Sequence, residues 1–431
     1  MRVRRTEMPA SRARVRGAGA GLRERPPRPR RWAGGAALVA GILLLALNLR
    51  AMITGLPPLF PELQAVLHVS SGTLALLAAV PVLCFGAFSG SAAPLSRRYG
   101  EERVLGGALL LIILGLLLRS LAPSALLFPG TVVAGAGIAL INVLLPSLVK
   151  RRMPARAGLL IGLYLLALAA GAIAASALAV PVFTAAGGGL PAARLALGLW
   201  AGPAVIAVVI WLPQLRYRTL PEARRASGGE AGRPRQAGAL ALRRYALAWQ
   251  VTLFMGLQSL SYYAALSWFP TMFRDRGVTA AYAGTLLALM NLGNAITALA
   301  MPILAQRLPD QRLLAVAAMV ATGGGLAGAG FGPPGLAAGF VILLGLGQGA
   351  TLGLGIYYTM ARAPDPATAA SLSAFAQGIG YLLASTGPLL IGFLHTATGG
   401  WDVPLTVLLG VAVLQLITGW LAGRAKTVPA G

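Results

Sequence analysis

Arg50 is the residue whose type and position most suggest binding chemistry, because it is a lone cation in a long apolar run. It lies in the stretch ALNLRAMITGLPPLF, and it is the one charged residue between Trp32 and Phe60. On a helix, Ala46, Arg50 and Thr54 would form a small, polar stripe with the arginine at its centre. Unless its side chain reaches a helix end at Gly55 and the surrounding water, we expect Arg50 to bind an anionic or strongly polar group.

Other polar residues occur in the middle of apolar runs at helical spacing. Asn291 and Asn294 share one helix face, and Gln258 and Tyr262 share another. With Arg50 and Thr54, the candidate binding residues are Asn142, Tyr164, Gln258, Tyr262, Asn291, Asn294, Gln348, Gln377 and Tyr381. They predict a neutral, hydrated lining with one positive charge, although each amide could instead hydrogen-bond a neighbouring helix.

Residues of the types that catalyse reactions or bind metals are few in this sequence. The chain has 2 histidines and one cysteine, Cys84, and none of its 11 acidic residues falls in the middle of an apolar run. We therefore predict no enzyme activity, no metal site and no cofactor. The stretch GLGQGATLGLG lies within an apolar run and lacks a phosphate-loop lysine, so its glycines Gly345, Gly349 and Gly353 predict close helix contact instead.

The composition requires these side chains to be held by membrane helices. The 431 residues are 57% hydrophobic and 11% charged, with a mean hydropathy of +0.75. Such runs predict an all-α membrane protein, because about 20 apolar residues cross a bilayer as a helix. Twelve transmembrane helices are expected, at residues 33–59, 72–94, 104–122, 126–149, 157–180, 194–214, 245–270, 280–305, 312–331, 336–361, 369–393 and 403–423.

The basic residues predict the orientation of these helices. Of 36 lysines and arginines, 31 fall on one face of the predicted topology, together with both termini. That face is therefore predicted to be cytoplasmic, in the inner (plasma) membrane. Arg119 lies near the outer end of its helix, where it is expected to extend to the interface. The net charge of +25 then reflects topology and contact with the lipid bilayer, and no nucleic-acid binding is predicted.

Sequence repeats divide the chain into two halves. Pro58 matches Pro270 at an offset of 212 residues, and Arg152 matches Arg362 at an offset of 210. The larger offset makes Tyr262 the counterpart of Arg50. Duplication of six helices is typical of secondary transporters and predicts two pseudo-symmetric six-helix bundles. The predicted parts are a disordered basic cytoplasmic arm at 1–32, bundles at 33–215 and 245–423, a cytoplasmic linker at 216–244 and a cytoplasmic tail at 424–431.

One loop carries a family motif. In SRRYGEERVL, residues Arg98, Gly100 and Arg103 fit the loop between the second and third helices of the major facilitator superfamily, while Arg97 stands where that motif has aspartate. The stretches LNLRAMITGLPPLFPEL, VPVLCFG and GAGIALINVLLPSLVKRRMP resemble the bacterial cyanate and 2-nitroimidazole transporter family within that superfamily. The resemblance covers most of the first half, and the second half matches mainly in pattern.

The resemblance implies a monomeric secondary transporter that works by alternating access. It implies a small solute such as cyanate or a nitroimidazole, and Arg50 favours an anionic or polar one. A multidrug or toxic-compound efflux pump of the same superfamily, and a channel or sensor, are the alternatives. The sequence leaves the coupling ion open.

Overall fold

The computed structural model describes residues 35–121, 123–217 and 242–429, and within these ranges the chain forms helices and no strands. The first half contains α1 (Gly35–Thr54), α2 (Phe60–Leu67), α3 (Ser71–Phe88), α4 (Ala92–Tyr99), α5 (Glu101–Leu121), α6 (Pro123–Arg152), α7 (Ala157–Ala185), α8 (Gly189–Gly198) and α9 (Ala201–Trp211). The second half contains α10 (Ala246–Asp275), α11 (Ala280–Ala305), α12 (Arg312–Phe331), α13 (Ala337–Ala361), α14 (Pro366–Thr398) and α15 (Asp402–Ala422). The predicted arm and most of the predicted linker lie outside the described residues.

The prediction of a twelve-helix membrane fold is confirmed. In the described part of the chain, eleven helical segments are long and apolar enough to cross a membrane. The twelfth helix, α10, has 30 residues, which gives a length of roughly 45 Å. It is not among the eleven segments, and its polar residues include Gln258, Ser261 and Tyr262. Two of these residues, Gln258 and Tyr262, are candidate site residues.

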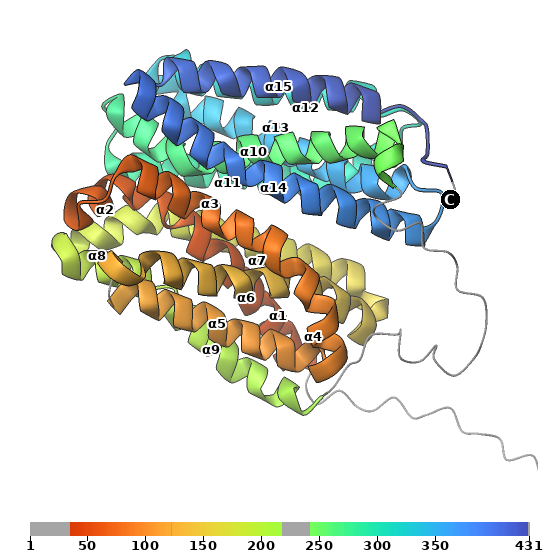
Figure 1. Ribbon diagram of the computed structural model, residues 1–431, viewed down its shortest axis with the longest axis horizontal. Coiled ribbons are helices and arrows are strands. Elements are labelled where there is room, and N and C mark those ends of the chain that lie inside the picture. Colours follow the sequence, from red (N-terminus) through yellow and green to blue (C-terminus); the bar gives the residue numbers. More distant parts are fainter. Residues whose placement is uncertain (1–34, 122, 218–241, 430–431) are drawn as a thin grey trace, which may run out of the picture.

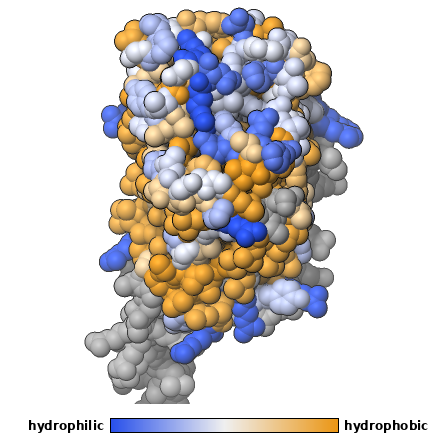
Figure 2. Space-filling model, turned by 90° about the vertical axis from the view of Figure 1, so that its left-hand side faces the viewer, coloured by the Kyte–Doolittle hydropathy of each residue, from blue (hydrophilic) through white to orange (hydrophobic). Residues whose placement is uncertain are grey.

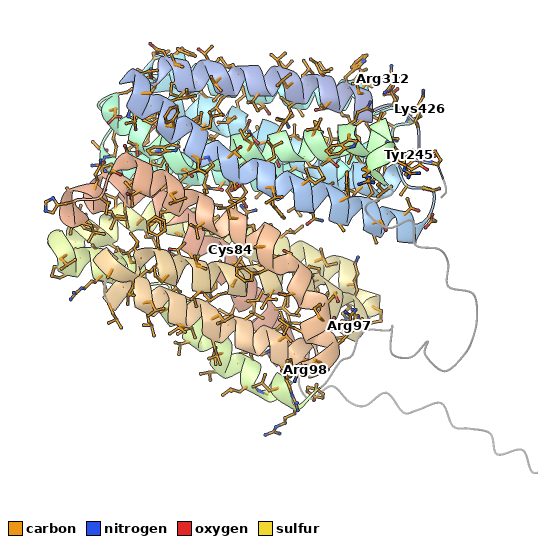
Figure 3. All side chains as sticks on the ribbon, viewed as in Figure 1. Cys84, Arg97, Arg98, Tyr245, Arg312 and Lys426 are labelled. Atoms are coloured by element: carbon orange, nitrogen blue, oxygen red, sulfur yellow. The ribbon has the colours of Figure 1, made fainter. Side chains whose placement is uncertain are left out.

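The two halves lie side by side, with the first half below the second in Figure 1. We call the end that carries α2 and α8 the α2 end. The opposite end, where residues 217 and 242 flank the linker, is the linker end. Figure 3 shows Arg97 and Arg98 of the first half and Arg312 and Lys426 of the second at the linker end. The basic loops of both halves therefore gather at one end, as the charge pattern predicted.

The outer surface is rich in exposed apolar side chains. Leu313 is 76% exposed and Phe393 is 68% exposed, which is typical of helices that face lipid. Figure 2 looks onto the α2 end, where hydrophilic residues gather mainly over the upper part and hydrophobic residues cover much of the lower part. Inside, one cluster of buried hydrophobic residues extends through both halves.

Two predicted membrane spans are interrupted in the structure. The first span ends as an α-helix at Thr54 and continues as a 3₁₀ turn, Pro57–Leu59, followed by α2. Pro57 and Pro58 cause this break, because proline has no N–H to continue the helical ladder. The sixth span is divided into α8 and α9 near Trp200.

Glycines bring α11 and α13 into close contact, as the sequence predicted. A Cβ atom added to Gly345 would overlap the carbonyl oxygen of Met290, and one added to Gly349 would overlap that of Asn294. Only glycine permits this approach of the two backbones. The contact fixes α11, and therefore Asn291 and Asn294, against α13.

Candidate functional site

Arg50 lies on the last full turn of α1 and points toward the second half. Its Nη1 donates a hydrogen bond to the hydroxyl of Tyr262 at 3.2 Å, and its guanidinium carbon lies 5.4 Å from the centre of that ring. The sequence repeat made these two residues counterparts. Residues related by a two-fold axis touch only close to that axis, so Arg50 marks the centre of the interface between the halves.

A cavity of about 260 Å³ surrounds this pair, and eight of the eleven candidate binding residues line it. They come from α1, α6, α7, α10, α11 and α14 and therefore from both halves. These residues are Arg50, Asn142, Tyr164, Tyr262, Asn291, Asn294, Gln377 and Tyr381. Both halves thus supply polar groups to one site, although a role of each residue in binding stays a prediction.

The polar residues of the cavity are connected by hydrogen bonds. Tyr262 donates its hydroxyl proton to Oδ1 of Asn291 at 2.7 Å, so a lone pair of the same oxygen accepts the bond from Arg50. Asn291 in turn donates to the carbonyl oxygen of Leu287 at 2.9 Å. On the other side of the cavity, Tyr164 donates to Oδ1 of Asn142 at 3.3 Å. This network holds the side chains in fixed orientations around the arginine.

A second compartment of about 650 Å³ adjoins the first and extends toward the linker end. It shares Asn142, Gln377 and Tyr381 with the first compartment. Its other lining residues include Ser89, which begins the turn after α3, and Ala370 near the start of α14. The site of Arg50 therefore continues as one hollow toward the end at which the basic loops lie.

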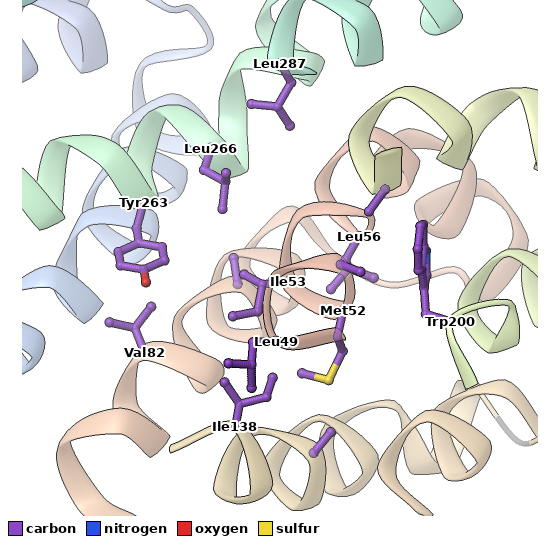
Figure 4. Packing of buried hydrophobic residues seen from close by; sticks show 14 of the residues in the cluster. Leu49, Met52, Ile53, Leu56, Val82, Ile138, Trp200, Tyr263, Leu266 and Leu287 are labelled. Carbon is purple, nitrogen blue, oxygen red and sulfur yellow. The ribbon is translucent and has the colours of Figure 1, made fainter. Parts of the chain in front are cut away.

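The α2 end, by contrast, is closed by contacts between the halves. Phe60 packs edge to face against Trp268, with the ring centres 5.8 Å apart. Glu62 forms an ion pair with Arg274, and the two charged atoms are 2.6 Å apart. Beneath these contacts, Figure 4 shows Ile53 of α1 and Leu56, just after the end of α1, facing Leu266 of α10. The cavity and its arginine are therefore covered on this side by packed side chains.

Three candidate residues do not line the cavity. Thr54 is fully buried, and its hydroxyl donates to the carbonyl oxygens of Arg50 and Ala172 at 3.0 and 3.2 Å. It shares a helix face with Arg50, as predicted, but α7 covers this face one turn later. Gln258 of α10 donates to Oε1 of Gln348 of α13 at 3.2 Å, and both are buried. These two amides therefore hydrogen-bond each other between neighbouring helices and do not line the cavity, which is the alternative that their sequence positions left open.

The loop motif lies in a polar cluster at the linker end. Gly100 has φ of 90°, which favours glycine, and it joins α4 to α5. Arg103 is exposed, whereas the guanidinium of Arg98 lies 5.2 Å from the ring centre of Tyr99. Buried Glu102, which is not among the residues expected from the motif, pairs with Arg152 at 2.9 Å.

The second half contains a buried arginine that corresponds to Arg152. Arg362, the counterpart of Arg152, bonds to Gln311 and to the carbonyl oxygen of Ala422 at 2.9 Å. Arg152 likewise bonds to Gln214, near the end of the sixth span. Each arginine thus connects corresponding segments of its own half. The pairing of Arg152 with Arg362 in the repeat could have predicted this shared role.

The expectation that Arg119 extends to the interface is wrong. Its side chain is 2% exposed, and Nη1 donates to the carbonyl oxygen of Met52 at 3.3 Å. The last carbonyls of a helix lack partners within it, and α1 ends at Thr54, so Arg119 satisfies part of that helix end. Arg119 thereby fixes the turn of α1 that carries Arg50.

Comparisons with known proteins agree with this architecture. The profile of the Major Facilitator Superfamily matches residues 40–388. The chain is 40% identical over 394 residues to the 2-nitroimidazole transporter of Escherichia coli (strain K12), covering 91% of this chain and 96% of that protein. It is 31% identical over 392 residues to the cyanate transport protein CynX of the same organism, covering 87% and 95%.

A solved structure supports the fold. It is a bacterial homolog of the human lysosomal transporter Spinster, in an inward-facing and unoccupied conformation. The two chains superpose with a TM-score of 0.73 and 16% identity, over 92% of this chain and 99% of the other. At this identity the likeness concerns the fold alone.

Proposed function

This chain belongs to the Major Facilitator Superfamily, and we propose that it is a secondary transporter that moves a small anionic or strongly polar solute by alternating access. Its full-length relatives are transporters, a class of proteins that are not enzymes. In the proposed cycle, the two halves rock about the site between them and open it to each side in turn. Arg50 is the cation that binds the solute.

The observation that carries this proposal is the position of Arg50. It lies in a cavity between the halves, and among the described residues no acidic side chain lines that cavity. A cation in a membrane interior is costly, and it is kept there when a ligand or a pathway requires it. A guanidinium offers five N–H donors, which suits a small anion or a nitro group.

The proposed orientation places the linker end in the cytoplasm of a bacterial cell and the protein in its inner membrane. Support comes from the gathering of Arg97, Arg98, Arg312 and Lys426 at that end, because cytoplasmic loops carry the excess of basic residues. In this orientation the cavity extends toward the cytoplasm, and the closed α2 end faces outward.

The names of the relatives suggest which solutes to test first. Cyanate and 2-nitroimidazole, named for two proteins that are 31% and 40% identical to this chain, are both small, and cyanate is an anion. Purified protein in vesicles is assayed for uptake of each labelled solute. We expect saturable uptake of at least one of them.

The role of Arg50 is tested with Arg50→Ala and Arg50→Lys. Removing one partner of a desolvated charge pair costs about 3–5 kcal/mol, so Arg50→Ala should reduce transport about 10²- to 10⁴-fold. Arg50→Lys keeps the charge and should be impaired less. Size-exclusion profiles and yields equal to wild type serve as the folding control. Wild-type affinity and rate in folded Arg50→Ala would contradict the role of Arg50.

A further inference from the structure

The cavity carries a positive charge without a protein counter-ion. Arg50 makes one hydrogen bond to a described residue, the bond to Tyr262, which leaves its remaining N–H donors free for water or ligand. Tyr262 is neutral and uses its own proton for Asn291. Because the counterpart of Arg50 in the repeat is this tyrosine, the second half contributes no opposite charge at the same depth.

The described acidic residues lie away from the cavity, near helix ends. Four are engaged in ion pairs that the cavity does not reach, namely Glu62 with Arg274, Glu101 with Arg151, Glu102 with Arg152, and Asp310 with Arg312. The others are Asp275, Asp365 and Asp402, which are exposed. Within the described part of the chain, the site of Arg50 therefore has a net charge of +1.

This charge affects how the empty protein can change conformation. In the present state Arg50 is half-buried and reaches a hollow large enough for water. Alternating access requires a state in which the linker end has also closed over the cavity. Closure around an empty site would remove water from the guanidinium without giving it a counter-ion, which is strongly unfavourable. A bound monovalent anion neutralises the charge and removes that barrier.

We propose that the chain is an exchanger of monovalent anions, in which only the anion-loaded protein interconverts rapidly between its two open states. The inference rests on the proposed function and deepens it, because it names both the substrate class and the mode of transport. A divalent anion would leave a net charge of −1 in the closed site, and a cation would raise the charge to +2. Both are therefore poor substrates.

The test measures uptake of labelled cyanate and labelled benzoate into vesicles that contain the full chain. The vesicles are loaded either with the same unlabelled anion or with sulfate. Valinomycin and equal potassium on both sides hold the membrane potential at zero, so that charge movement does not limit uptake. We expect uptake of at least one anion to be tenfold or more faster into vesicles loaded with that anion. A tenfold ratio corresponds to about 1.4 kcal/mol in the barrier.

Three results would overturn the inference in distinguishable ways. Equal, saturable uptake into both kinds of vesicle would show transport without exchange, which leaves the proposed function intact. If the protein takes up neither anion under either condition, and does not take up 2-nitroimidazole, the proposed function itself is refuted. Uptake of 2-nitroimidazole alone, without either anion, would keep transport and refute the anion selectivity.

A substituted carboxylate provides a second, independent readout. Asn291→Asp can still accept the hydrogen bond from Tyr262, and it places a negative charge close to Arg50. We expect it to lower the ratio of exchange to net uptake at least fivefold, because the empty site is then neutral. Thr279→Asp, which adds the same charge at the exposed start of α11 and outside both compartments, is the matched control and should keep the wild-type ratio. An unchanged ratio in a folded Asn291→Asp variant would contradict the electrostatic argument.

Discussion

Neutralising Glu62 should open the α2 end of the molecule. Glu62 of α2 and Arg274 of α10 join the two halves through an ion pair of 2.6 Å, and their side chains are 11% and 24% exposed. The pair exists only while this end is closed. Under alternating access the ion pair must break whenever the α2 end opens. It therefore stabilises only the state in which this end is closed.

The magnitude follows from the burial of the pair. A hydrogen bond to a charged group contributes about 1.5–3 kcal/mol, and exposed ion pairs contribute about 0–1 kcal/mol. For a partly exposed pair we take about 1–2 kcal/mol, which changes an equilibrium about 5- to 30-fold. Glu62→Gln should therefore shift the population toward the state that is open at the α2 end by this factor.

Distances between spin labels would measure this shift. Gln64 of α2 and Ala397 of α14 are exposed on opposite halves at this end and can be changed to cysteine for labelling. The long-distance population should grow in Glu62→Gln, and the charge swap of Glu62→Arg with Arg274→Glu should restore the wild-type distribution. Unchanged distances in both Glu62→Gln and Arg274→Gln would refute the reasoning, because the pair would then contribute nothing to closure.

Three further predictions concern packing and the site. Gly349→Ala should lower the melting temperature of detergent-purified protein by several degrees, because the added Cβ would overlap the backbone of α11. Gly339 lies in an open position on the same helix, so Gly339→Ala should leave the melting temperature unchanged or slightly higher. Tyr262→Phe removes the acceptor for Arg50, and we expect a solute affinity that differs from wild type by about 3- to 10-fold in a binding titration, with normal folding. Gln258→Leu leaves buried Gln348 without its side-chain partner, so thermal stability should fall while the KM for transport stays at the wild-type value.

The sequence determined the fold class and much of the site. Apolar runs of fixed length specify membrane helices, because the backbone in lipid must satisfy its own hydrogen bonds. The positions of Arg97, Arg312 and other basic residues predicted that the loops of both halves share one end. The repeat offset identified Tyr262 as the counterpart of Arg50, and residues on a two-fold axis must meet. These signals are local or periodic, so they can be read along the chain.

Only the tertiary structure decided which polar groups face the cavity and which are consumed by neighbouring helices. Thr54 and Gln258 have the same kind of spacing as the residues of the cavity, yet α7 covers the first and α13 pairs with the second. Arg119, expected at the interface, instead binds the end of α1. Helical periodicity gives the face on which a residue lies, whereas its neighbour on that face depends on how helices distant in sequence pack together.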